Sequence, residues 1–210
     1  MSSDETKTIE TLIWEQAPLE DIKAARTEGR DWLNEGSDPE ILCRWAANYG
    51  RADLLEWLRE NEMPWDTIVT SGAADCGHVK VLEWAYNNGC PIDQSAWMFA
   101  LWKNHVDVLQ WIHDLEVPLE PYGTHYDHQH NVCIEALSAN KPDILKWAIK
   151  NGYSWNEYTC AHVIKDQPSS RRGRVFSLAL EHGCPFDKDE CLSIARHFQD
   201  NNVAKLIECV

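Results

Sequence analysis

Apolar residues recur along this chain in short stripes that predict pairs of amphipathic helices. Around the middle of the chain, Val79, Leu82 and Tyr86 follow one another at helical spacing. Gly77 precedes this stripe and Gly89 follows it, so each glycine is expected to end a helix. Neither short helix could bury its apolar face alone. The pattern therefore predicts stacked helix pairs that share one core.

The same pattern returns at a fixed interval. Trp57, Trp84 and Trp111 lie 27 residues apart, and a proline follows each of them seven residues later. Two landmarks of different chemistry in one register indicate an internal repeat. The first helix of a copy is expected to begin at an Asp or Asn that caps its N-terminus, and the candidates are Asp66, Asp93, Asn156 and Asp187.

This register predicts an all-α fold, a helical repeat solenoid of about seven helix pairs. We expect residues 1–210 to form a single repeat domain. Residues 1–36 would be a divergent N-terminal capping unit, 37–187 the central repeats and 188–210 a C-terminal capping repeat. Two insertions lengthen the period, near 121–132 and 167–173, and both are expected to be loops.

One column of tryptophans at a single repeat position is expected to pack in the core: Trp57, Trp84, Trp111 and Trp147. Each lies two positions after a leucine of the same helical stripe, as Trp84 does after Leu82. Cysteines form a second column at one repeat position, and we interpret them as small apolar residues in helix packing; the residues are Cys43, Cys133, Cys160 and Cys191, with Thr70 and Trp97 in the other copies. A redox or metal role for these thiols is the alternative.

Composition excludes several classes of function. The chain has 19 Lys and Arg against 34 Asp and Glu, a formal net charge of −15. Binding to nucleic acid or to anionic membranes is therefore not expected, because both depend on basic side chains. No apolar run is long enough to span a bilayer, and no signal peptide pattern is visible, so we expect a cytoplasmic monomer.

The stretch from Ala73 to Trp84 reads Ala-Ala-x-x-Gly-His-x-x-Val-Leu-x-Trp, which resembles the two helices and turn of an ankyrin repeat. Ankyrin units have ~33 residues. The shorter period removes the segment where that family builds its β-hairpin finger, so the fingers are expected to be largely absent. The short, tryptophan-rich units are similar to divergent ankyrin-like repeats of giant DNA viruses of amoebae and of some protists. The resemblance implies protein binding, in the host cytoplasm if the chain is viral.

The sequence contains no catalytic or nucleotide-binding motif that we recognise. We therefore predict a non-enzymatic interaction module without a cofactor, whose first helices line a concave face and whose loops form its rim. Its protein partner is expected to be basic, because a net negative charge speeds encounter with a positive one. The candidate contact residues are Gln94, Trp97, Met98, Trp102 and Lys103, then His125, Tyr126 and His128 in the first insertion.

Three alternatives remain open from the sequence. The cluster His125, Asp127, His128 and His130 carries ligand types that suit Zn²⁺, Cu²⁺ or Ni²⁺, which would indicate a metal-binding protein or a metal-dependent enzyme. The acidic chain could instead act as a decoy that mimics nucleic acid. The basic stretch Ser169–Arg174 is expected to be a solvated loop, with a phosphorylation or docking site as its alternative.

Overall fold

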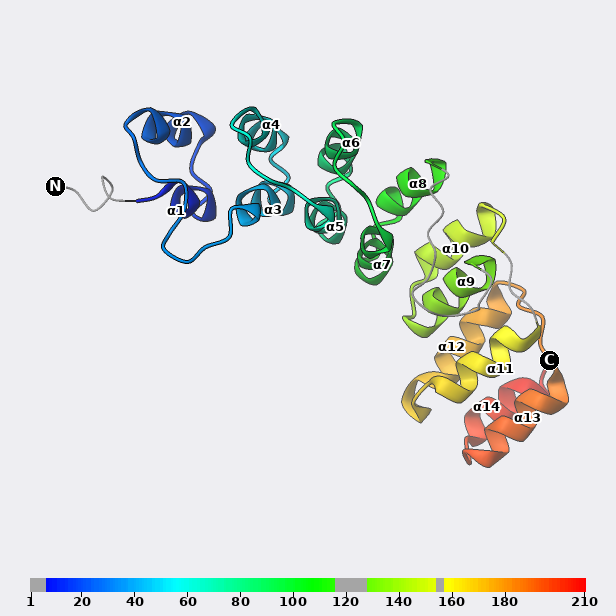
Figure 1. Ribbon diagram of the computed structural model, residues 1–210. Coiled ribbons are helices and arrows are strands. Elements are labelled where there is room, and N and C mark those ends of the chain that lie inside the picture. Colours follow the sequence, from blue (N-terminus) through cyan, green and yellow to red (C-terminus); the bar gives the residue numbers. More distant parts are fainter. Residues whose placement is uncertain (1–6, 116–127, 154–156) are drawn as a thin grey trace. The chain divides into compact units, whose positions relative to one another are not determined.

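The computed structural model describes residues 7–115, 128–153 and 157–210, which form fourteen helices and no strand (Figure 1). The expected all-α class is confirmed for these residues. The chain divides into two compact units, Met1–Pro118 and Leu119–Val210. The helices of the first unit are α1 (Ile9–Trp14), α2 (Leu19–Thr27), α3 (Glu40–Asn48), α4 (Ala52–Glu60), α5 (Thr67–Asp75), α6 (Val79–Asn87), α7 (Gln94–Lys103) and α8 (Val106–Asp114).

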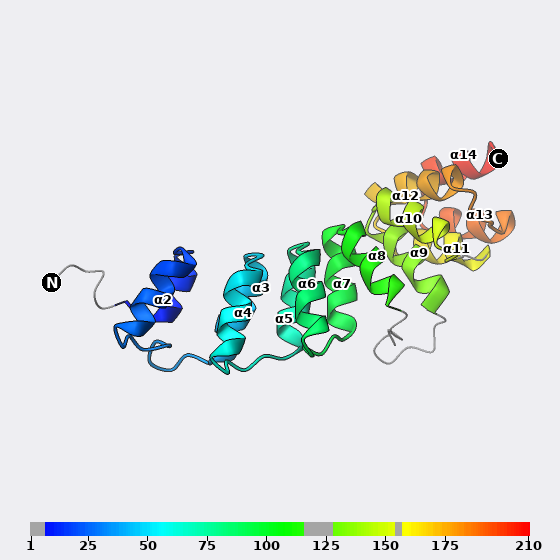
Figure 2. The same cartoon turned by 90° about the horizontal axis from the view of Figure 1, so that it is seen from above.

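Neighbouring helix pairs of the first unit pack in two layers. The first helices of the pairs form one layer, in which α3 contacts α1 and α5, and α5 contacts α7. The second helices form the other layer, in which α6 contacts α4 and α8. Figure 1 shows the odd-numbered helices of this unit on one side and the even-numbered helices on the other, and Figure 2 shows the same unit from above, where the two layers overlap.

The second unit also consists of helix pairs. Its helices are α9 (His128–Ser138), α10 (Pro142–Lys150), α11 (Glu157–Asp166), α12 (Ser169–Glu181), α13 (Lys188–His197) and α14 (Asn201–Glu208). The first helices again follow one another, because α11 contacts both α9 and α13, and α12 contacts α14. Helix α12 also contacts α9, so the layer of first helices is repeated within the second unit, whereas the second helices pack differently.

The helix boundaries follow the capping residues of the sequence. The side chains of Asp66, Asp93 and Asp187 each accept a hydrogen bond of 2.8 Å from a backbone N–H of the first turn. These bonds satisfy donors that a helix N-terminus otherwise leaves open. The three N-caps are confirmed, whereas Asn156 lies outside the described residues.

Histidines at the start of two second helices connect successive helix pairs. The Nε2–H of His78 donates to the carbonyl oxygen of Asn48 at 3.0 Å, and His105 bonds to Asp75 in the same way at 3.0 Å. Each ring also lies over a glycine of the preceding pair: a Cβ at Gly77 would be 2.7 Å from the His105 ring. Gly77 is also left-handed, with φ +75°. The turn therefore needs glycine for its backbone conformation and for the close approach of the ring.

The tryptophan column is not in the centre of the core, and that expectation is wrong for the first unit. The leucines two positions earlier are fully buried, but Trp57, Trp84 and Trp111 are only partly buried. Trp84 packs edge to face on Trp65 of the preceding loop with ring centroids 6.0 Å apart, and the Arg59 guanidinium lies 4.4 Å from the Trp65 ring. These rings cover the edge between neighbouring pairs, where part of each ring is exposed to solvent. Trp147 of the second unit is buried as expected, with 6% of its surface exposed.

The second insertion is helical, which corrects its assignment to a solvated loop. Helix α12 begins at Ser169, so the extra residues lengthen a second helix at its N-terminus. Arg172 within this stretch is buried, and its Nε donates to the carbonyl oxygen of Ile164 at 2.9 Å. Its guanidinium also lies 4.0 Å from the Asp200 carboxylate and 3.9 Å from the Phe198 ring centroid. These contacts hold Arg172 inside the helix packing.

The His–Gly contact predicts a difference between two glycines with similar backbones. Gly77→Ala should destabilise the protein by about 2–4 kcal/mol, because strain at positive φ adds to the clash with His105. Gly89→Ala should cost only about 1 kcal/mol, because Gly89 has φ +87° and nothing within 4 Å of its Cβ position. Urea unfolding measures both. Equal losses would contradict the role of the histidine ring.

The burial pattern predicts that the leucine column outweighs the tryptophan column in stability. Leu82→Ala should cost about 3–5 kcal/mol, since Leu82 is fully buried. Trp84→Ala should cost about 1–3 kcal/mol despite its larger side chain, because part of the ring already contacts water. Thermal and urea unfolding of the two variants check the order. A larger loss of unfolding free energy for Trp84→Ala than for Leu82→Ala would contradict the partial burial of Trp84.

Candidate functional site

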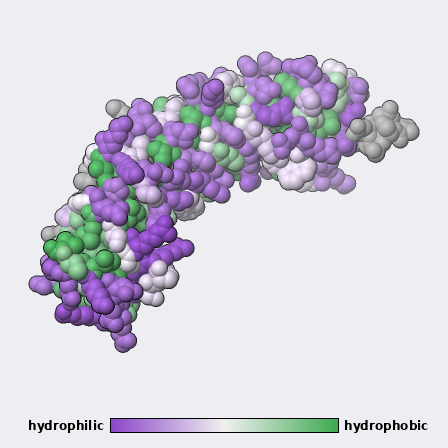
Figure 3. All heavy atoms as spheres, turned by 180° about the vertical axis from the view of Figure 1, so that it is seen from behind, coloured by the Kyte–Doolittle hydropathy of each residue, from purple (hydrophilic) through white to green (hydrophobic). Residues whose placement is uncertain are grey.

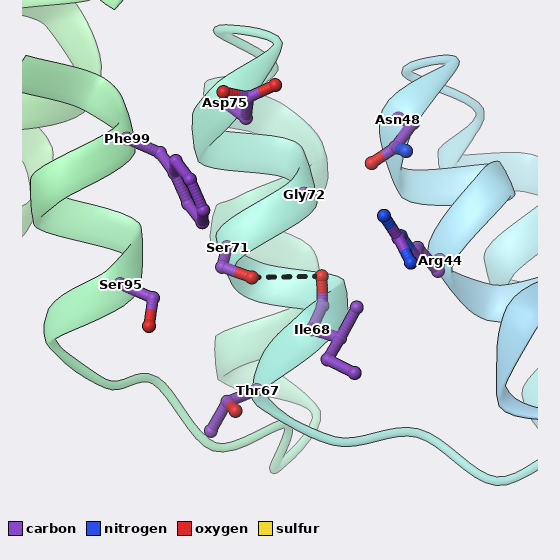
Figure 4. Close-up of a pocket in the computed structure, with 9 residues that line it drawn as sticks. All are labelled: Arg44, Asn48, Thr67, Ile68, Ser71, Gly72, Asp75, Ser95 and Phe99. Carbon is purple, nitrogen blue, oxygen red and sulfur yellow. Dashed lines mark hydrogen bonds between the residues drawn. The ribbon is translucent and has the colours of Figure 1, made fainter. Parts of the chain in front are cut away.

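A groove of about 450 Å³ crosses three successive first helices of the first unit (Figure 4). We name it the α5 groove. Small residues of α5 form its floor, and its walls are formed by residues of α3 and α7 together with Ile68 of α5. It is lined by Arg44 and Asn48 from α3, by Thr67, Ile68, Ser71, Gly72 and Asp75 from α5, and by Ser95 and Phe99 from α7.

The groove exists because α5 carries small residues where its neighbours carry large ones. In the 27-residue register, Ser71 and Gly72 correspond to Met98 and Phe99 of the next helix pair. The Ser71 hydroxyl is satisfied within the helix, where it donates to the Ile68 carbonyl at 3.2 Å. Gly72 has a second reason to be small, because a Cβ there would lie 2.3 Å from the Asn48 amide oxygen. The Asn48 side chain thus packs directly onto the floor.

Apolar side chains form part of the groove wall. Ile68 is 41% exposed, although most isoleucines in folded proteins are buried. Phe99 faces α5 from the opposite side and packs edge to face on Trp102, with ring centroids 5.8 Å apart (Figure 4). Trp102 is itself 52% exposed. Apolar surface of this kind on a helix layer can be covered by a partner.

The charged groups at the groove differ in how they are compensated. The Lys103 ammonium lies 3.7 Å from the Asp75 carboxylate. Arg44 is exposed and reaches toward α5, and among the residues described its guanidinium forms no hydrogen bond or ion pair (Figure 4). The four other arginines of residues 7–115 bond to backbone carbonyls or carboxylates: Arg26, Arg30, Arg51 and Arg59.

The contact residues that the sequence predicted differ in how exposed they are in the structure. Trp102 and Lys103 are exposed, and Gln94 and Met98 are partly buried. Trp97 is only 8% exposed, so its assignment to a partner surface is wrong. It occupies the same register position as Cys43 and Thr70, which are fully buried, and the helix face rather than the residue type decides its place.

The histidine cluster lies largely beyond the part of the chain that the structure describes. His125, Tyr126 and Asp127 are outside the described residues. His128 and His130 belong to the first turn of α9, so this end of the insertion is helical rather than a loop, but their side chains are not described. Across the described ranges, no group of three or more His, Cys, Asp or Glu side chains is arranged to hold a metal ion.

Sequence reasoning missed most residues of the α5 groove. Its candidates included Met98 and Trp102, the latter because a large residue there breaks a pattern of small ones. The residues at the same positions in the preceding pair are Ser71 and Asp75, which line the groove. Applying the 27-residue register backwards from Trp102 would have found this surface. The large residues mark its wall, and the small ones mark its floor.

The cysteine column packs in the interior, as expected. Cys43, Cys133, Cys160 and Cys191 are each at most 1% exposed. Burial raises the pKa of the Cys43 and Cys191 thiols to about 12. The Cys160 thiol donates to the Cys184 sulfur at 2.8 Å, and this bond, with burial, raises the Cys160 pKa. These thiols remain protonated at neutral pH and are poor nucleophiles.

No family model matches the sequence, and no curated protein matches it.

Within the described residues, none of the helices is long and apolar enough to cross a membrane. On the face of the molecule in Figure 3, apolar residues form small groups separated by hydrophilic ones.

The burial of the cysteines predicts their reactivity. Cys76 and Cys209 are exposed, and the other six cysteines are buried. Iodoacetamide at mildly alkaline pH should therefore alkylate Cys76 and Cys209 rapidly, and all eight thiols only after unfolding, because the thiolate is the reactive species. Intact mass spectrometry counts the labelled thiols over time. Rapid labelling of Cys160 or Cys191 in the folded protein would contradict the described packing.

Proposed function

We propose that the chain is a non-catalytic, ankyrin-like repeat module that binds a segment of a protein partner in the α5 groove. The observation that supports this proposal is a groove spanning α3, α5 and α7 whose wall includes the exposed Ile68. Repeat proteins build binding surfaces in this way, by varying exposed residues across helices that a common core keeps in register.

The chemistry of the groove favours a protein segment as its occupant. Apolar groups at Ile68 and Phe99 alternate with hydroxyls at Thr67 and Ser95. Protein interfaces combine an apolar centre with a polar rim in the same manner. The groove crosses several helices, so it suits an extended or helical segment with side chains at more than one position. Trp102, beside the groove, would add an aromatic contact of the kind that often dominates binding energy.

Long-range charge sets how a partner would approach. With a net charge of −15, the chain should associate fastest with a basic protein, and the rate should fall as ionic strength rises. The proposal also includes that the protein is monomeric and cytoplasmic.

Peptide selection with two matched variants tests the proposal. A random peptide library displayed on phage is selected against the wild-type protein, and the affinities of enriched peptides are measured by fluorescence polarisation. Ile68→Arg should weaken binding at least about tenfold, because it places a charge on the apolar wall. Ile149→Arg is the control, since Ile149 is similarly exposed, at 38% against 41%, but lies on α10. Its effect should stay within about twofold.

Two results would contradict the proposal. One is the absence of any enriched peptide. The other is enrichment of peptides whose binding is insensitive to Ile68→Arg, which would show that they bind elsewhere. Both variants should melt like the wild type, because each replaces an exposed side chain.

A further inference from the structure

The α5 groove contains a cation that the described chain does not neutralise. The Arg44 guanidinium reaches from α3 toward the floor at Gly72 (Figure 4), and it has no hydrogen-bond or ion-pair partner among the described residues. Glu40 lies one turn earlier on the same helix, yet no ion pair joins the two. Asp and Glu outnumber Lys and Arg in this chain, 34 to 19, so most arginines are expected to have a carboxylate nearby, and Arg44 is an exception.

The remaining charge at the groove is already compensated. Asp75 is paired with Lys103 at 3.7 Å, so the carboxylate at that end does not offset Arg44. The groove therefore carries a local positive charge at its α3 wall, although the chain as a whole is strongly negative. An arginine presents several N–H donors in a planar fork that fits a carboxylate with two parallel hydrogen bonds.

Resting on the proposed function, we infer that the partner segment carries an aspartate or glutamate that pairs with Arg44. A large apolar side chain of the same segment lies over Ser71, between Ile68 and Phe99. The small floor residues provide the depth for this side chain, and the position of Arg44 beside the floor sets the distance to the carboxylate. The two contacts together define a short acidic and apolar motif.

A single carboxylate fits this site better than a phosphorylated residue. Recognition of phosphate on proteins commonly uses clusters of arginines. Here Arg44 is the only arginine that lines the groove, and the field of a chain with net charge −15 opposes a doubly charged group. One guanidinium compensates one carboxylate. The net charge of the chain governs the encounter with the partner, whereas Arg44 governs the docked contact.

A double-mutant cycle tests the contact. In a peptide selected against wild-type protein, the acidic residue is replaced by its amide, and each peptide is measured against wild type and Arg44→Ala. The amide should weaken binding to wild type roughly tenfold and leave binding to Arg44→Ala unchanged. Arg174→Ala is the control, because Arg174 is also exposed but lies on α12. It should preserve the full effect of the amide.

Selection against Arg44→Glu provides a second readout. The peptides enriched on this variant should carry Lys or Arg where the wild-type peptides carry Asp or Glu. If Ile68→Arg abolishes binding but the peptide carboxylate has no effect on wild type, the groove binds protein segments and the carboxylate inference is wrong. If binding is insensitive to Ile68 and to Arg44 alike, the proposed function fails as well. A phosphorylated peptide that outcompetes its glutamate counterpart would also overturn the inference.

Discussion

The contact between a histidine ring and the glycine turn of the preceding helix pair sets the geometry of the first unit. His105 bonds to the last carbonyl of α5 and lies against Gly77, and His78 does the same one pair earlier at Gly50. A free carbonyl at a helix end gains a donor, and a side chain at the glycine would separate the two pairs. Arg51 performs the equivalent task at the start of the unit, where it donates to the Ala17 carbonyl at 2.7 Å.

This constraint places equivalent repeat positions of neighbouring helices next to one another, and the α5 groove depends on that alignment. Once α3, α5 and α7 are held in register, a small residue on one helix leaves a space that large residues on the next helix border. Ser71 and Gly72 create the space, while Phe99 forms its far wall. The first helices also contribute to the core, with Leu42 of α3 and Leu101 of α7 fully buried, so only the exposed positions of this face can change without disturbing it.

The aromatic residues show how size competes with position. In the first unit, part of Trp84 extends to the edge between two closely packed pairs and meets Trp65. The same arrangement joins Trp32 to Trp57, with ring centroids 5.2 Å apart, and again an arginine lies on the loop tryptophan. These clusters lie at the edges between neighbouring helix pairs.

The sequence alone determined the helical class, the helix pairs and their N-caps, because spacing and capping act within a few residues. It also placed the buried cysteine column correctly. Only the tertiary structure decided that Trp97 is buried and that Trp84 is at an edge. It also decided that the Arg172 side chain is buried among helices. Each outcome depends on which neighbouring helix faces the side chain. The α5 groove belongs to the same class. It arises from differences in side-chain size across three helices, and the unpaired state of Arg44 becomes visible only when the positions of all surrounding carboxylates are known.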